Sequence, residues 1–131
     1  HARASPARLE GVTPGIAGVP SRAPISQAGR GWGAVAGTRE NPQIVAQSCY
    51  FVDPSTNLAE TAFMVGPAWQ GSGLGKAMQQ RMIEHARSRG VLGFVAEILS
   101  INAHMIKLAN AGSSNVRVEP NGETVKVTAL F

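Results

Sequence analysis

A glycine-rich stretch near the middle of the chain has the residue types that could hold a phosphate group. Gln70-Gly71-Ser72-Gly73-Leu74-Gly75-Lys76 follows the apolar run from Ala62 to Val65 and precedes apolar residues at helical spacing. Glycine has no Cβ, so its backbone can approach a ligand closely, and the free N–H groups at the start of a helix attract anions. The order strand, glycine turn, helix therefore predicts a site for a phosphate-bearing molecule.

The residues around these glycines exclude two common phosphate loops. A mononucleotide P-loop ends in Gly-Lys-Ser/Thr, whose hydroxyl binds magnesium, but Ala77 follows Lys76 here. A dinucleotide fingerprint has the spacing Gly-x-Gly-x-x-Gly, and the third glycine, Gly75, comes one position too early after Gly71 and Gly73. The expected ligand therefore belongs to another class of phosphate-bearing molecule.

The stretch resembles the acyl-CoA pyrophosphate loop of the GNAT superfamily of N-acetyltransferases, whose signature is Gln/Arg-x-x-Gly-x-Gly/Ala. Gln70, Gly73 and Gly75 match its fixed positions. Ala59-Glu60-Thr61-Ala62-Phe63-Met64-Val65 is similar to the family's fourth strand, and Leu99-Ser100-Ile101-Asn102-Ala103-His104-Met105 to the start of the helix after its fifth strand. The resemblance covers about residues 33–131, and the order of these blocks is similar to that in bacterial protein lysine acetyltransferases.

The resemblance implies acetyl-CoA as co-substrate and a role for each matching position. The backbone at the end of the fourth strand would pair with the pantetheine arm, the glycine loop would hold the pyrophosphate, and the helix start would lie near the thioester. The residues so assigned are, in that order, Met64 and Val65; Gln70, Gly71, Ser72, Gly73, Leu74, Gly75 and Lys76; and Asn102.

Acyl transfer to an amine needs a general base, because a protonated amine cannot attack. By resemblance to the family subset with the pattern Ala-Glu-x-Ala-Phe, the base is Glu60; the alternative is an ordinary solvated strand residue. Glu97 is a second candidate base, and His104 is a candidate proton donor that otherwise faces solvent. Many family members use a tyrosine on the later helix as the acid, but the single tyrosine, Tyr50, lies on an earlier predicted strand.

The leading interpretation is an acetyl-CoA-dependent N-acetyltransferase whose acceptor, a protein lysine or a small amine, attacks directly in a ternary complex. The alternative is a non-catalytic CoA-binding or regulatory module. It arises because residues 1–31, rich in proline and glycine, do not resemble the strand and two helices with which the family builds the acceptor wall. A basic RNA-associated protein is a third and weaker interpretation.

Composition limits the remaining classes. The 131 residues, 44% of them hydrophobic, suffice for one domain with one core. The net charge of +4 is scattered, which disfavours nucleic acid and suits a polyanionic cofactor. A single cysteine permits no internal disulfide, and the three histidines show no metal-ligand spacing, so we expect no metal. With no apolar run of membrane length and no signal-peptide core, we expect a reduced, cytoplasmic setting without membrane contact. A homodimer is compatible with the sequence.

The predicted fold is α/β (α+β), a GNAT-like mixed and mostly antiparallel sheet flanked by helices. Residues 1–31 are expected to be irregular, with at most a short helix at about 4–10, and residues 32–131 to form the acyl-CoA-binding domain. Alternation predicts strands at 34–37, 44–52 and 58–65 in an antiparallel meander. A turn at residues 53–57 separates the last two of these strands.

The second half is expected to begin with a helix from Leu74 to Arg89 that ends at Gly90, with Leu74, Met78, Met82, Ile83 and Ala86 on its apolar face. A buried strand at 91–99 then implies a crossover and a parallel pair with the strand before the helix. Ser100 is expected to cap a helix over 101–111, with Ile101 facing inward. A hairpin of 116–119 and 124–129, with its turn at Pro120-Asn121-Gly122-Glu123, closes the chain.

Overall fold

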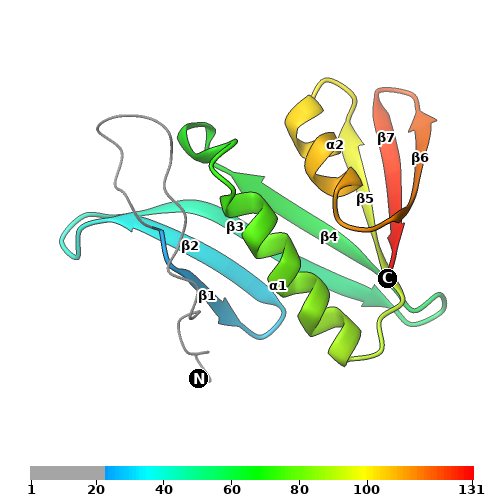
Figure 1. The fold of residues 1–131 in the computed structure, drawn as a ribbon, viewed down its shortest axis with the longest axis horizontal. Helices are drawn as coiled ribbons and strands as arrows, with labels where there is room; N and C mark the ends of the chain where they lie inside the picture. The colour runs from blue at the N-terminus through cyan, green and yellow to red at the C-terminus, as the bar shows by residue number, and fades with distance from the viewer. Residues whose placement is uncertain (1–22) are drawn as a thin grey trace. The chain divides into compact units, whose positions relative to one another are not determined.

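The computed structural model describes residues 23–131, so the predictions for residues 1–22, a short helix among them, lie outside the described residues. The elements of the described part are shown in Figure 1. In chain order they are β1 (Ile25–Ala28), β2 (Gly31–Gly37), β3 (Pro42–Asp53), β4 (Leu58–Val65), the 3-10 helix η1 (Pro67–Trp69), α1 (Leu74–Ser88), β5 (Gly93–Leu99), α2 (Ala103–Asn110), β6 (Asn115–Asn121) and β7 (Thr124–Leu130).

The strands form one mixed sheet in the order β1-β2-β3-β4-β5-β7-β6. The pairs β1–β2, β2–β3, β5–β7 and β6–β7 are antiparallel, and β4–β5 is parallel. The parallel pair follows from the connection through α1, because a crossover helix returns the chain in the same direction. The predicted α+β class, with a mostly antiparallel sheet flanked by helices, is confirmed.

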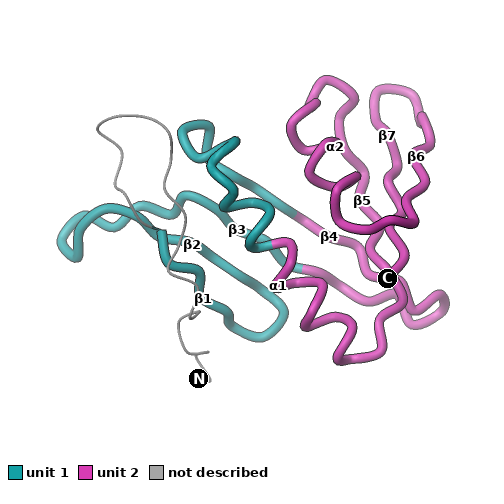
Figure 2. Tube along the Cα trace, viewed as in Figure 1, with its two compact units in different colours: residues 1–49, 63–78 teal, residues 50–62, 79–131 magenta. Residues whose placement is uncertain are grey.

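The chain divides into two compact units (Figure 2). The first consists of residues 1–49 and 63–78, and the second of residues 50–62 and 79–131. In the first unit, apolar residues of β1 and β2 share one face: Ile25 is the register partner of Ala34, and both are fully buried. Trp32 and Ala46 continue this buried face along β2 and β3.

The strand β1 corrects the expectation that the chain is irregular up to residue 31. Gly29, at φ +61°, and Arg30 turn the chain between β1 and β2, and the Gln27 amide donates to the Gly29 carbonyl. The glycine that suggested a loop is therefore the turn of a hairpin, since a two-residue hairpin requires positive φ. The four residues of β1 alternate too little between apolar and polar types for the strand to be predicted from the sequence.

The core of the second unit contains an aromatic group. Tyr50 is fully buried, its ring lies 5.6 Å from that of Phe94, and Phe94 meets Phe131 edge-on at 4.9 Å. The Tyr50 hydroxyl is hydrogen-bonded to Nδ1 of His85 at 2.8 Å, so its polar end has a partner inside the protein. The sequence predicts Tyr50 and Phe94 on strands and His85 on a helix, but it does not predict these contacts.

Helix α1 agrees with its prediction to within one residue at its end, which is Ser88 rather than Arg89. Gly90 has φ +79°, the left-handed conformation expected of a helix-terminating glycine. Of the predicted apolar face, Leu74, Met78, Met82 and Ala86 are buried, and Ile83 is half-buried. The strand after it, β5, begins at Gly93 rather than at residue 91.

Helix α2 begins later than predicted. Its N-cap is Asn102, whose side chain accepts from the Met105 N–H at 3.2 Å, and not Ser100. Ser100 does not cap the helix, because its N–H and its hydroxyl both donate to the carbonyl of Glu123. Ile101, predicted to face inward, therefore precedes the helix and is 90% exposed.

Candidate functional site

The glycine loop begins where β4 ends. The Gly66 N–H donates to the carbonyl of Val45 at 2.7 Å, and the turn η1 follows. Trp69, the last residue of η1, is only 3% exposed, so its indole is packed inside the protein. The loop from residue 70 to 73 is thereby fixed at its base by backbone hydrogen bonding and a buried indole.

Two glycines of this loop have backbone conformations that other residues rarely adopt. Gly71 has φ +79° and Gly73 has φ +93°. Between them, Ser72 is bound to the base of the loop: its N–H and hydroxyl donate to the Trp69 carbonyl at 3.2 and 2.6 Å, and its Oγ accepts from the Leu74 N–H at 3.3 Å. The Ser72 hydroxyl is thus part of the loop's own support.

The remaining N–H groups make this loop suitable for an anion. Within residues 23–131, no loop or cap hydrogen bond is formed by the N–H groups of Gly71, Gly73, Gly75 or Lys76. The last two belong to the first turn of α1, where N–H groups have no intrahelical acceptor. A Cβ on Gly71 would meet nothing within 4 Å, so its backbone is open to an approaching group. These features fit the diphosphate of a coenzyme.

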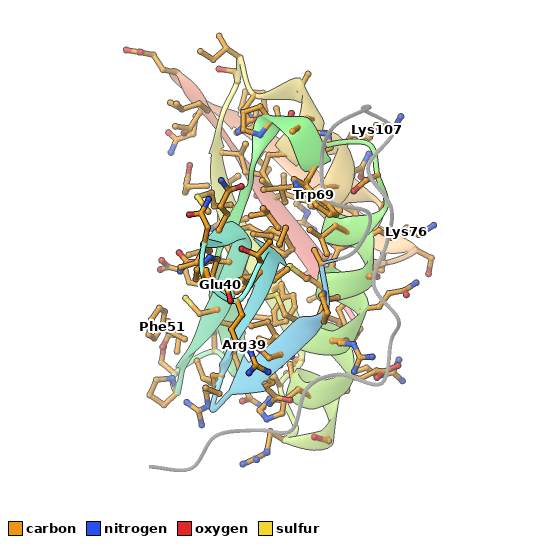
Figure 3. All side chains as sticks on the ribbon, turned by 90° about the vertical axis from the view of Figure 1, so that its left-hand side faces the viewer. Arg39, Glu40, Phe51, Trp69, Lys76 and Lys107 are labelled. Atoms are coloured by element: carbon orange, nitrogen blue, oxygen red, sulfur yellow. The ribbon has the colours of Figure 1, made fainter. Side chains whose placement is uncertain are left out.

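The Lys76 side chain extends from α1 into solvent, away from the sheet, as Figure 3 shows. It offers an exposed positive charge next to the loop. The end of β4 has a different character. Met64 is exposed, Val65 is buried, and the Gln70 amide donates to the Val65 carbonyl at 3.2 Å. Gln70 therefore connects the start of the loop to the end of the strand.

Glu60, the predicted base, lies on β4 in the second unit, and its side chain is exposed. The parallel ladder between β4 and β5 joins Leu58 to Gly93, Ala59 to Phe94, and Glu60 to Val95. Glu60 thus occupies the last pair of that ladder. Its carboxylate has access to solvent at the point where the two strands cease to pair.

The other predicted site residues of the second unit have assigned contacts. The Asn102 side-chain oxygen caps α2, which leaves its amide nitrogen for other partners. Glu97, the alternative base, accepts hydrogen bonds from the Thr124 hydroxyl at 2.7 Å and from the Asn121 amide at 3.4 Å. His104 is half-buried on α2. These bonds favour a supporting role for Glu97. That role depends on the cross-strand register and not on the local sequence.

The structure brings together the predicted residues of the first unit, since Met64, Val65 and the loop from Gln70 to Lys76 are continuous with one another. The buried supports of the loop, Trp69 and the Val45 carbonyl, were not predicted as parts of a site. Residues 23–131 contain no cluster of three His, Cys, Asp or Glu side chains that could hold a metal ion. None of the helices in that range has the length and apolarity of a membrane span.

The arrangement of strand, glycine loop and helix before a parallel strand defines a mixed α+β fold of the acyltransferase type. The model of the acetyltransferase (GNAT) family matches residues 19–112. The chain therefore belongs to the GNAT family of acetyltransferases. A comparison with curated protein sequences gave no match.

Solved structures support the same fold. The chain is 25% identical to the GNAT domain of S. lividans PAT, with a TM-score of 0.60 over 78% of this chain and 61% of that one. It is 23% identical to yncA, a putative acetyltransferase from Salmonella typhimurium solved with its cofactor acetyl-CoA, with a TM-score of 0.56 over 82% and 62% of the two chains. For the ribosomal-protein-S18-alanine N-acetyltransferase from Escherichia coli, the identity is 20% and the TM-score 0.54, over 79% and 71%. The chain spans about three fifths of the S. lividans domain.

Proposed function

We propose that this protein is an acetyl-CoA-dependent N-acetyltransferase that acts on a primary amine. The observation that carries the proposal is the loop between β4 and α1, where two positive-φ glycines, Gly71 and Gly73, open the backbone at a helix start in a chain of the GNAT family. The acceptor is a protein lysine or a small amine, attacking directly in a ternary complex.

In this proposal, the loop binds the coenzyme and fixes its position. The N–H groups of Gly71, Gly73, Gly75 and Lys76 bind the diphosphate, with the partial positive charge of the helix start behind them. Ser72 and Gln70 keep the loop in this conformation through their bonds to Trp69 and Val65. The backbone of Met64 and Val65 lies beside the pantetheine arm.

The bound coenzyme supplies an acyl thioester, whose C–S bond breaks as the new C–N bond forms. Glu60 accepts the proton that the attacking amine must lose, directly or through one water. Its exposed carboxylate can reach an amine that arrives from solvent. The departing thiolate takes a proton from solvent or from a side chain such as His104, and Asn102 lies near the thioester.

The test is an assay of free thiol with acetyl-CoA and a panel of amines, lysine peptides among them. Thiol release that depends on an amine supports the transferase, and the preferred amine identifies the acceptor. Coenzyme binding in a thermal-shift assay without turnover on any amine would instead favour the non-catalytic module. If CoA causes no thermal shift, the cofactor assignment itself is wrong.

A further inference from the structure

Strand β6 forms one end of the sheet and carries charges of opposite sign on either side of a valine. In the described part of the chain, β7 is its one neighbour, so its other edge presents free backbone groups. The sequence along this edge is Val116-Arg117-Val118-Glu119-Pro120. Arg117 and Glu119 are both exposed, and they point to the same face because side chains alternate along a strand.

The hairpin turn determines which backbone groups of β6 face outward. Gly122, at φ +66°, and Glu123 form a two-residue turn, so the flanking residues Asn121 and Thr124 direct their N–H and C=O groups at each other. By alternation, Pro120, Val118 and Val116 direct theirs away from β7. Proline has no N–H and is tolerated where that position faces away from the sheet, which agrees with this assignment.

The other face of β6 is apolar and continues an apolar surface of the sheet. Val116, Val118 and Pro120 are the register partners of Ala129, Val127 and Val125. Those three residues are in turn partners of Phe94, Ala96 and Ile98 on β5. Val127 and Ala129 are buried, whereas Val118 at the end of the sheet is 43% exposed. A further strand beside β6 would therefore cover apolar surface as well as pair with free backbone groups.

We propose that β6 is the contact strand of a symmetric homodimer, in which the β6 strands of two copies pair antiparallel about a two-fold axis at Val118. In this register Arg117 of each copy lies opposite Glu119 of the other. Val116 lies opposite Pro120, and because proline has no N–H, this pair forms one backbone bond, from the Val116 N–H to the Pro120 carbonyl, whereas the two Val118 residues exchange two. The charge order across the sheet, Glu97 opposite Lys126 and Lys126 opposite Glu119, then continues with Arg117 of the second copy.

The registers next to this one are unfavourable. An axis at Arg117 places two arginines opposite each other, and an axis at Glu119 places two glutamates opposite each other, which destabilises a cross-strand pair. An axis between two residues joins the apolar face of one copy to the charged face of the other. Charged residues and proline on an edge strand often prevent such pairing. Here, however, the edge carries one positive and one negative charge. Two-fold symmetry therefore brings opposite charges together, whereas it would bring a row of like charges into repulsion.

The test uses the 131-residue chain and its dissociation constant for dimerisation, measured by sedimentation velocity over a range of concentrations. Arg117→Glu places four carboxylates at the axis, and Glu119→Arg places four guanidinium groups there. Each is expected to weaken dimerisation at least about tenfold. The double variant Arg117→Glu/Glu119→Arg restores both ion pairs, so its dissociation constant should return to within about threefold of the parent value.

Two controls distinguish the strand pairing from a general effect of charge. Arg39→Glu changes the same charge at the exposed turn between β2 and β3 (Figure 3) and should leave the dimer unchanged. An equimolar mixture of the two single variants should form a heterodimer, because each supplies what the other lacks. Unfolding melts of every variant verify that its fold is retained.

The proposal does not depend on acetyltransferase activity. It is overturned if the parent chain stays monomeric at concentrations up to about 100 μM, in the range of weak but specific association. It is also overturned if the single variants dimerise as the parent does, or if neither the double variant nor the mixture recovers the dimer.

Discussion

Glu60 and Val95 form the last pair of the parallel ladder between β4 and β5. On β5, the residues after Val95 continue to pair with β7 as far as Leu99 and Thr124, so β5 remains part of the sheet while its ladder with β4 has ended. An exposed carboxylate at this position lies beside strand backbone that no longer bonds to its neighbour. A ligand that needs both backbone partners and a proton acceptor could use these groups together.

Replacing Glu60 with glutamine is expected to lower kcat by about 10²- to 10³-fold, because the amide cannot accept the amine's proton. The affinity for CoA should not change, since Glu60 is outside the glycine loop. Glu97→Gln is the matched control: its carboxylate is bonded to Thr124 and Asn121, and its loss should leave kcat nearly unchanged. Steady-state kinetics of both variants show which of the two carboxylates acts as the base. Loss of activity in Glu97→Gln alone would transfer the role of base to Glu97.

Adding a methyl group at Gly71 is expected to weaken CoA binding about tenfold or more. Gly71 and Gly90 offer a matched pair, because both have φ +79° and neither would bring a Cβ within 4 Å of another residue. Alanine at either position should therefore cost a similar 1–2 kcal/mol, roughly the strain of a left-handed residue. Only Gly71→Ala places its methyl where the diphosphate would bind. Calorimetric titration of both variants with CoA makes the comparison, and equal affinities would contradict the assignment of the loop.

The parts of the fold that the sequence predicts are those with local signals. The glycine loop, the start of α1 and the last hairpin each depend on residues next to one another. The first two lie where they were expected, and the hairpin turns at Gly122-Glu123, within the expected turn at residues 120–123. Helix α1 also carries its apolar residues at regular spacing, so its buried face could be predicted almost completely.

The parts that could not be predicted depend on distant residues. Ser100 is as good a cap as Asn102 by residue type, but its hydroxyl donates instead to the carbonyl of Glu123, which is distant in the sequence. Strand β1 exists because β2 pairs with it, and its own four residues show no clear alternation. The bonds that hold Glu97 likewise come from cross-strand neighbours. A single sequence contains no local sign of such pairings.

The turn between β3 and β4 is expected to lose stability in acid. The hydroxyl and the N–H of Ser55 both donate to Asp53, at 2.7 and 2.9 Å, and these bonds lower the pKa of that carboxyl below its usual value near 3.8. A lowered pKa in the folded state means that the contribution is present at neutral pH. It is lost as the pH falls from the usual range through the lower folded-state pKa.

The measurement for this turn is the unfolding midpoint of the parent chain and of Asp53→Asn between pH 7 and pH 2. The variant should be less stable at neutral pH, and the difference should shrink as the carboxyl of the parent becomes protonated. Ser55→Ala, which removes the hydroxyl donor, should show a smaller difference with the same trend. A difference that stays constant down to pH 2 would show that the charge of Asp53 contributes nothing.

The start of β5 is expected to tolerate no side chain at Gly93. A Cβ there would lie 2.5 Å from the Ala129 carbonyl oxygen and 3.0 Å from Cα of Leu130, both backbone atoms of β7 that no rotamer change can move. Gly93→Ala should therefore cost about 2–3 kcal/mol as β5 and β7 are forced apart. Gly33→Ala on β2 is the control, because its nearest neighbour, the Ala46 carbonyl oxygen, would be 3.8 Å away. That substitution should be neutral or stabilise by about 0.5 kcal/mol, since it restricts the unfolded chain. Urea unfolding of the two variants separates the effects, and equal midpoints would mean that β5 and β7 are not packed this closely.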